Sequence, residues 1–313
     1  MKQKLSYRIK NWSIYNRSLI NRGNLTLWFS DDVVQSWYST LQTKKRGRRF
    51  TYSDACIEVA LTLRSLFQFP LRSTQGFLEG LVTMLGINLK VPHYSRLSRR
   101  AADLQIDLTK KIKKAEKLDL VIDSTGLKIY GEGEWKMRTH GKQKRRTWRK
   151  YHVAVNPKDH QVIEIILTEA NVHDATVLPD LLKNIDSIGT LYGDGAYTFK
   201  SGFDAIAAKN GKAKVPLRTG TSLVKNKLSP GQALRNEIVK EIRKSGGKTR
   251  WKKTSGYHLR SLVETHMFRL KTILGNKLNS RLMNNQKTEA RIRSKILNQM
   301  SSLGMPISVS KAA

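Results

Sequence analysis

The chain is strongly basic and only moderately apolar. It has 313 residues, 39% of them hydrophobic, and its 58 Lys and Arg against 24 Asp and Glu give a formal net charge of +34. An excess of this size opposes compaction and indicates a polyanionic partner, with nucleic acid the first candidate and an anionic membrane surface the second. The single cysteine, Cys56, excludes an intrachain disulfide.

No segment has the pattern of an export signal, a membrane helix or a nucleotide-binding loop. The N-terminus, MKQKLSYRIKNWSIYNRSLI, is polar and basic. No apolar run approaches the roughly 18 residues that span a bilayer. Neither a Walker loop nor a GxGxxG fingerprint is present. We therefore expect a cytoplasmic protein with no membrane partner and no nucleotide cofactor.

The first third of the chain is predicted to be helical after an irregular start. Residues 1–29 are basic and are expected to form a loosely ordered arm. Periodicity and capping residues then predict helices over 30–41, 51–67, 71–86 and 93–105. The last two resemble a helix-turn-helix, whose second helix would present Arg96, Arg99 and Arg100 to DNA. The alternative is a small helical bundle with solvated arginines.

The pattern changes at residue 118. Strands are predicted over 118–131, on either side of a turn at 156–161, and over 190–199 and 212–218, with helices over 173–186, 201–211 and 257–275. Residues 219–256 lose periodicity, and residues 281–295 are predicted to form a basic helix for DNA or dimer contacts. This order predicts a mixed α/β sheet with helices packed on it.

Two aspartates stand at the ends of predicted strands. Asp123 lies in VIDSTG and Asp194 in YGDGAY, where the flanking glycines leave room for a ligand. A buried ionised carboxylate costs several kcal/mol unless it is paired or bound to a metal. Each aspartate alone is more simply explained as a helix cap, as are Asp174 and Asp204. Asp174 is the alternative candidate for a further ligand.

A third acid lies on the predicted helix YHLRSLVETHMFRLK, residues 257–271. At about 100° per residue, Tyr257, Arg260, Glu264 and Lys271 fall within an arc of roughly 60°. Two aspartates and a glutamate can hold a pair of Mg²⁺ ions, which prefer oxygen ligands. Two such ions about 3.5–4 Å apart can cleave a phosphodiester. The Cys and His spacing of zinc sites is absent.

Three stretches together resemble the DDE transposases of bacterial insertion sequences, and most closely insertion-sequence family five. They are VIDSTGLKIYGEGEW, YGDGAY and YHLRSLVETHMFRLK, and the last matches the signature Y-x2-R-x3-E-x6-K at every position. The resemblance covers roughly residues 30–290. It implies a ribonuclease H-like catalytic core in which Asp123, Asp194 and Glu264 bind two Mg²⁺ ions, which Mn²⁺ can replace.

The resemblance also implies an organisation and an activity. Residues 30–117 would form the helical DNA-binding domain, residues 118–280 the catalytic domain with a short insertion at 219–256, and residues 281–313 a basic helix and tail. The protein would bind terminal inverted repeats, cleave at the element ends and join 3′-hydroxyls to target DNA in the bacterial nucleoid, as a homodimer or larger assembly. The alternatives are a catalytically silent DNA-binding protein and a nuclease that does not join.

The predicted DNA contacts lie in two further places. Residues 136–150 contain eight Lys or Arg and no acid, which favours phosphate neutralisation. Trp148 would either stack on an unpaired base or pack under the sheet. The signature residues would contact the phosphates near the scissile bond. The full set of predicted contacts outside the first domain is Arg145, Arg146, Trp148, Arg149, Lys150, Tyr257, Arg260 and Lys271.

Overall fold

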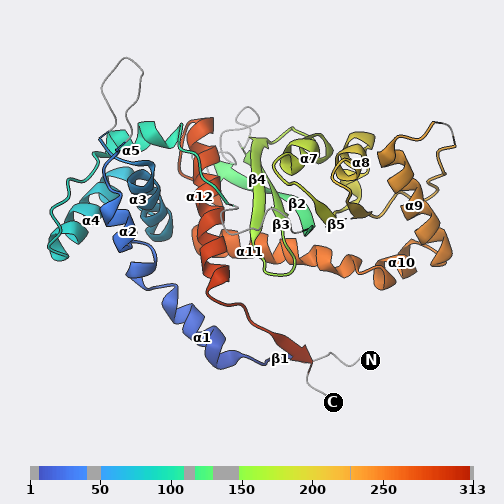
Figure 1. Cartoon of the computed structure of the whole chain (residues 1–313), viewed down its shortest axis with the longest axis horizontal. Helices are drawn as coiled ribbons and strands as arrows, with labels where there is room; N and C mark the ends of the chain where they lie inside the picture. Colours follow the sequence, from blue (N-terminus) through green and yellow to red (C-terminus); the bar gives the residue numbers. More distant parts are fainter. Residues whose placement is uncertain (1–6, 41–50, 109–116, 130–147, 226, 311–313) are drawn as a thin grey trace, which may run out of the picture. The chain divides into compact units, whose positions relative to one another are not determined.

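A computed structural model describes residues 7–40, 51–108, 117–129, 148–225 and 227–310. It divides the chain into two compact units, one formed by Met1–Leu104 and Ile296–Ala313 and the other by Gln105–Lys295 (Figure 1). Among the helices described, none combines the length and apolar character needed to cross a membrane.

The first unit contains a small bundle of three helices, α3 (Asp54–Phe67), α4 (Leu71–Met84) and α5 (Tyr94–Ala101). Ser53 caps α3 by accepting a hydrogen bond from the Cys56 amide. Each helix contributes at least one completely buried side chain to the bundle, among them Leu63, Leu78 and Leu97. The predicted helix over 30–41 is shorter than expected, because α2 covers only Asp31–Gln35.

The N-terminal arm has regular structure, contrary to the expectation of a loosely ordered segment. It contains β1 (Tyr7–Ile9), α1 (Trp12–Asn21) and the 3₁₀ helix η1 (Leu25–Leu27). β1 pairs antiparallel with β8 (Ser308–Ser310), from the other end of the chain. The Asn11 side-chain amide donates to the Met305 carbonyl at 3.0 Å. Partners almost 300 residues away hold this segment, and local sequence patterns do not reveal them.

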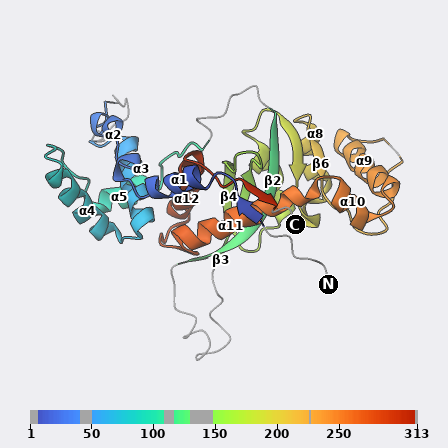
Figure 2. The same cartoon turned by 90° about the horizontal axis from the view of Figure 1, so that it is seen from below.

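The second unit is built on a six-stranded mixed sheet. Its strands are β2 (Leu118–Ile129), β3 (Trp148–Val155), β4 (Val162–Glu169), β5 (Ile188–Tyr192), β6 (Lys212–Lys214) and β7 (Lys277–Leu278). The order is β4-β3-β2-β5-β6, with β7 also on β2. β2, β3 and β4 are antiparallel, whereas β5 is parallel to β2 and β6 to β5. This is the predicted mixed sheet flanked by helices (Figure 2).

Alternation along the strands directs side chains to helices on both faces of the sheet. Ile122 and Ala154 join a core with α7 (Asp174–Leu182) and α8 (Lys200–Ala207). On the other face, the Tyr151 hydroxyl lies 3.2 Å from His266 Nε2 on α11 (Ser261–Leu274) and 2.7 Å from Ser294 Oγ on α12 (Met283–Ser302). The sheet therefore fixes α11, which carries Glu264.

The basic C-terminal helix, α12, exists but points its arginines inward. Arg293 is 2% exposed and binds Glu289 at 2.7 Å. Arg291 donates to Glu164 at 2.6 Å and to the Ile106 carbonyl at 3.0 Å. The expectation that the bases of this helix contact DNA or a second subunit is wrong for these two arginines, because each neutralises a buried acid.

Residues 219–256, expected to lack periodic structure, contain two helices, α9 (Pro230–Lys244) and α10 (Lys248–Thr254). A capping box between Ser229 and Gln232 starts α9, with proline in its first turn. Asp204 of α8 accepts hydrogen bonds from the Ser229 hydroxyl at 2.7 Å and the Gly231 amide at 3.1 Å. Asp204 therefore holds the start of α9 against α8.

We expect Gly231→Ala to destabilise the second unit. A Cβ at this position would come 2.3 Å from the Asp204 amide nitrogen and 2.6 Å from the Phe203 carbonyl carbon. Backbone cannot yield as a side chain does, so the expected loss in the free energy of unfolding is about 1–3 kcal/mol. Urea unfolding followed by circular dichroism measures it.

Gly80→Ala is the matched control, because a Cβ there meets no atom within 4 Å. In the helix α4 it should stabilise by about 0.5–1 kcal/mol. Equal effects of the two substitutions would contradict the close packing of α8 and α9.

Candidate active site

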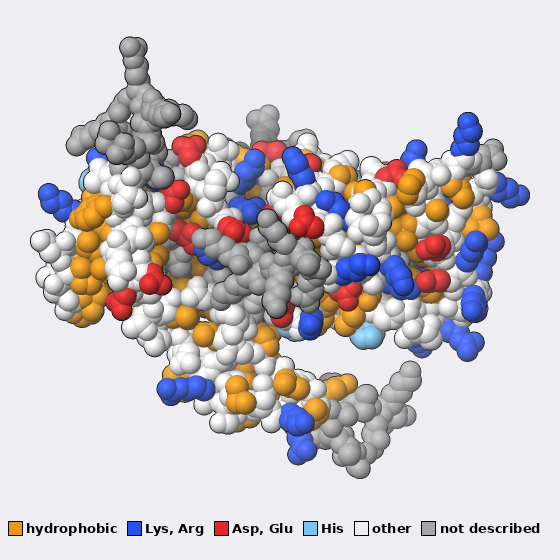
Figure 3. All heavy atoms as spheres, viewed as in Figure 1, with side chains coloured by type: hydrophobic (Ala, Val, Ile, Leu, Met, Phe, Trp, Pro, Cys, Tyr) orange, Lys and Arg blue, Asp and Glu red, His pale blue; other side chains and the backbone are white. Residues whose placement is uncertain are grey.

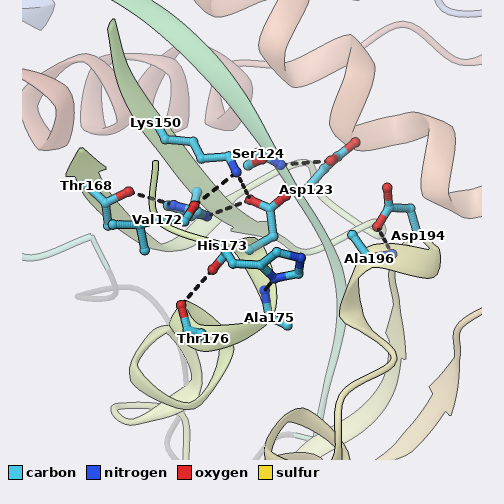
Figure 4. Close-up of polar contacts among 12 residues, drawn as sticks. Asp123, Ser124, Lys150, Thr168, Val172, His173, Ala175, Thr176, Asp194 and Ala196 are labelled. Atoms are coloured by element: carbon cyan, nitrogen blue, oxygen red, sulfur yellow. Dashed lines mark hydrogen bonds and ion pairs between the residues drawn. The ribbon is translucent and has the colours of Figure 1, made fainter. Parts of the chain in front are cut away.

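The first acid, Asp123, lies on β2 opposite Val153 of β3. Its Oδ1 accepts a hydrogen bond from the Ser124 amide at 2.8 Å (Figure 4). Burial raises the pKa of Asp123, and the negative charge of Asp194 adds to this effect, whereas the Ser124 hydrogen bond and Arg260 oppose it. A neighbouring cation such as Arg260 therefore favours the ionised form of this carboxyl group.

The second acid, Asp194, lies beside Asp123 because of the parallel register of two strands. Val121 of β2 pairs with Tyr192 of β5, and each acid follows its paired residue by two positions. Asp194 caps the 3₁₀ helix η2 (Gly195–Tyr197), accepting from the Ala196 amide at 2.9 Å (Figure 4). The predicted strand-end position is right for Asp194, which follows β5, and wrong for Asp123, which lies within β2 and beyond the part of that strand that pairs with β5.

The third acid, Glu264, is joined to Asp123 by one guanidinium group. Arg260 Nη2 lies 3.1 Å from Asp123 Oδ2, and Arg260 Nη1 lies 2.7 Å from Glu264 Oε1. Arg260 ends a 3₁₀ helix, η3 (Tyr257–Arg260), and α11 begins at the next residue. The predicted single helix is thus two elements, but Arg260 and Glu264 keep their spacing of one turn.

The donor chemistry fits divalent cations, although the acids are not arranged around one position. Three carboxylates are hard oxygen ligands of the kind that Mg²⁺ prefers. Nearby, the Tyr197 hydroxyl is buried and has no hydrogen-bond partner within the described residues. The same part of the chain contains no group of three or more His, Cys, Asp or Glu placed to hold a metal ion. Instead, Arg260 lies between two of the acids.

The other two signature residues also lie close to these acids. Burial raises the pKa of Tyr257, the charge of Arg260 opposes this, and the carboxylates of Asp194 and Asp123 raise it further. Lys271 Nζ donates to Thr125 Oγ1 at 2.6 Å, two residues beyond Asp123 on β2. Tyr257 and Lys271 therefore place polar groups near the acids, although Tyr257 lies in η3 and not on the single helix whose arc was predicted.

A second cluster adjoins Asp123 on the neighbouring strand. Lys150 Nζ lies 3.0 Å from Asp174 Oδ1 and donates to the Val172 carbonyl at 3.1 Å (Figure 4). His152 Nδ1 lies 3.4 Å from the same Asp174 oxygen. Lys150, predicted to contact DNA, therefore has an internal partner that the sequence did not indicate. Asp174, the alternative ligand, is the first-turn acid of α7 and is paired with a lysine.

Two more predicted DNA contacts on β3 have partners inside the unit. Arg149 donates to Gln286 Oε1 at 2.8 Å and forms an ion pair with Glu169. A Cβ added at Gly126 would lie 3.0 Å from the Trp148 ring, so this tryptophan packs against β2. Arg145 and Arg146 lie outside the described residues.

The three arginines of α5 in the first unit differ in their surroundings. Arg100 forms an ion pair with Asp54 and donates to the Tyr52 carbonyl at 2.9 Å. Arg96 donates to Thr51 Oγ1 at 3.1 Å. Arg99 is exposed. A role in DNA contact stays a prediction for this helix, and Arg99 is its most accessible base.

Comparisons with known proteins show which family the chain resembles. A family model described as "Transposase DDE domain" matches residues 114–299, more than half of the chain. A second family model with the same description matches residues 20–132. A cryo-EM structure of a piggyBac transposase synaptic complex with hairpin DNA aligns at 12% identity over 91% of this chain and 75% of that chain, with a TM-score of 0.38.

The His152 side chain should make stability depend on pH. Burial lowers its pKa to about 4, despite the nearby Asp174, from an ordinary value of 6.5. Between these values the unfolded chain binds a proton that the folded chain does not. Stability is therefore lost as the pH falls, by up to about 1.4 kcal/mol per pH unit for this histidine.

Removing this titration tests the assignment. With His152→Gln, the free energy of unfolding should fall less steeply between about pH 6 and pH 4 than in the wild type, by up to that slope. Urea unfolding at several pH values measures it. His258→Gln, at an exposed position, is the control. If both variants keep the wild-type slope, His152 is not held neutral by burial.

Proposed function

Because the chain belongs to the family of proteins with a transposase DDE domain, we propose that it is an insertion-sequence transposase of the family-five group. It binds the terminal inverted repeats of its element, cleaves at the element ends and joins the 3′-hydroxyls to target DNA. Two ends must meet for joining, so the active form has at least two copies of the chain. The reaction takes place on the DNA of the nucleoid, in the cytoplasm.

The observation that carries this proposal is the bridge made by Arg260. One guanidinium is within 3.1 Å of an Asp123 oxygen and within 2.7 Å of a Glu264 oxygen. Asp123 and Glu264 are 141 positions apart in the sequence, and the parallel register of β2 and β5 brings Asp194 next to Asp123. Carboxylates placed this close together repel one another and lower the stability of the fold, so their grouping here indicates a function that requires them.

The proposed reaction assigns a separate role to each group of residues. When bound, two Mg²⁺ or Mn²⁺ ions would supply Lewis-acid stabilisation for the attacking and leaving oxygens. Asp123, Asp194 and Glu264 would hold them, the first two fixed by hydrogen bonds from the Ser124 and Ala196 amides. Tyr257 and Lys271 would orient the phosphates next to the scissile bond.

Neutralising the acids should abolish cleavage and leave DNA binding intact. Asp123→Asn, Asp194→Asn and Glu264→Gln should each slow cleavage of the element ends by about 10³-fold or more, equivalent to about 4 kcal/mol of activation free energy. Asp180→Asn, at an exposed position of α7, is the matched control. Binding is followed by electrophoretic mobility shift on the same duplexes.

Two other functions are separated in the same experiment. A DNA-binding protein without catalysis would show no metal-dependent cleavage in the wild type. A nuclease of this fold would cleave but fail to join a pre-cut end to target DNA in the presence of Mg²⁺. Full cleavage by the three variants would overturn the assignment of the acids.

Arg260 should compete with divalent ions in the DNA-free protein. Removing its charge with Arg260→Gln leaves Asp123 and Glu264 without their shared cation. We therefore expect Mn²⁺ to bind about ten-fold more tightly, a gain of about 1.4 kcal/mol. Isothermal titration calorimetry measures it. Arg243→Gln, which removes the same charge at an exposed position of α9, should leave the affinity unchanged, and weaker Mn²⁺ binding by Arg260→Gln would contradict the competition.

A further inference from the structure

A helical hairpin leads directly into the candidate active site and carries a large excess of positive charge. The α9–α10 hairpin, residues 230–254, is followed by η3 and α11. Its segment 240–253, KEIRKSGGKTRWKK, contains seven Lys or Arg and one acid. That acid, Glu241, is already neutralised, because Lys214 Nζ lies 2.7 Å from its Oε2. Although burial opposes it, hydrogen bonds from Lys214 and Trp251 lower the pKa of Glu241.

Most bases of the segment 240–253 are exposed, and the structure shows no ion pair between them and an acid among the described residues. Figure 3 shows Lys and Arg side chains gathered over the part of the second unit that holds α9 and α10. Within the described residues, none of these bases forms an ion pair. The five that are exposed are Lys240, Arg243, Lys244, Arg250 and Lys253. A cluster of unpaired like charges is repulsive by itself, so a polyanionic ligand would stabilise it.

The opposite side of the hairpin is packed into the core of the unit. Leu234, Ile238 and Val239 of α9 and Trp251 of α10 belong to the same hydrophobic core as the sheet. Trp251 is 1% exposed, and its Nε1 donates to Glu241 Oε2 at 3.0 Å. The bases are therefore presented by a fixed scaffold rather than by a loop.

Two ring contacts connect the hairpin with the acids. The Trp251 and Tyr257 ring centroids are 5.9 Å apart, and Lys252 Nζ lies 5.3 Å from the Tyr257 ring centroid. Tyr257 in turn lies in the electrostatic field of Asp123, Asp194 and Glu264. A ligand on the hairpin would thus be held beside the residues proposed to do the chemistry.

We propose that the exposed face of the α9–α10 hairpin binds the phosphate backbone of duplex DNA irrespective of sequence. The inference rests on the proposed function for the identity of the polyanion. The surface offers no stacking platform for unpaired bases, because its tryptophan is buried. This favours a duplex over a single strand.

The amides of the hairpin are used inside the protein. Asn236 Oδ1 accepts from the Val224 amide at 3.0 Å, and Asn236 Nδ2 donates to the Val224 carbonyl at 2.9 Å. Gln232 completes the capping box of α9. The Asn and Gln of the hairpin, the side chains that read adenine, are therefore engaged inside the protein, and phosphates are the main group left for its Lys and Arg to contact. Sequence-independent contacts of this kind suit target DNA, which lies outside the element and does not carry its inverted repeats.

The test is the salt dependence of DNA binding. A triple variant, Lys244→Gln, Arg250→Gln and Lys253→Gln, is compared with the wild type on a random-sequence duplex, without metal so that no cleavage intervenes. The slope of log K against log salt should become shallower by about one unit for each lost phosphate contact, about three in all. Binding to a single strand of the same length should change less than binding to the duplex.

The control variant carries the same change in charge at exposed lysines elsewhere in the unit, Lys183→Gln, Lys200→Gln and Lys287→Gln. Its slope should match that of the wild type, and thermal melting checks that both variants are folded. Equal slopes for the hairpin variant and the wild type, or an equal loss in the control, would overturn the proposal, as would a loss confined to single strands. Binding without cleavage by the wild type would contradict the proposed function and leave the hairpin assignment standing.

Discussion

The second unit is organised around a cation between two acids. Asp123 is half-buried, and burial together with the charge of Asp194 makes its ionised form costly. Arg260 offsets this cost and at the same time binds Glu264. A guanidinium with several donors in one plane is suited to two carboxylates at once. Because Asp123 belongs to β2 and Arg260 to the element before α11, this interaction also fixes that helix against the sheet.

Other contacts in the second unit hold the residues around Asp123 in place. Parallel pairing of β2 with β5 sets Asp194 next to Asp123, and Lys271 binds Thr125 on the same strand. On the adjoining strand, β3, Lys150 forms an ion pair with Asp174. Asp174 is therefore not an additional unpaired acid near Asp123. The α9–α10 hairpin extends the same core and is followed by η3, which begins at Tyr257, so the proposed DNA-binding surface and the group of acids share one scaffold.

The sequence predicted the elements better than their partners. Strand pattern and helical spacing depend on local periodicity, so the position of Asp194 after a strand and the spacing of Arg260 and Glu264 could be predicted, whereas β2 continues past Asp123. The partners of Arg260, Lys150 and Arg291 could not be predicted, because periodicity indicates the face of an element on which a residue lies and not the residue that it contacts. The helix α9 was missed although Ser229, Pro230 and Gln232 form a recognisable start. The regular structure of the N-terminal arm was not predicted for a different reason, since its strand β1 pairs with β8 at the other end of the chain.

The central claim is that oxygens from positions 123, 194 and 264 share one site for divalent ions. The most direct measurement replaces Mg²⁺ with Fe²⁺ and generates hydroxyl radicals at the bound ion, which cut the chain nearby. Mass spectrometry then locates the cuts. The account predicts cuts around all three positions, suppressed together by excess Mg²⁺. Cuts at one of the three alone, or at other places in the chain, would contradict it.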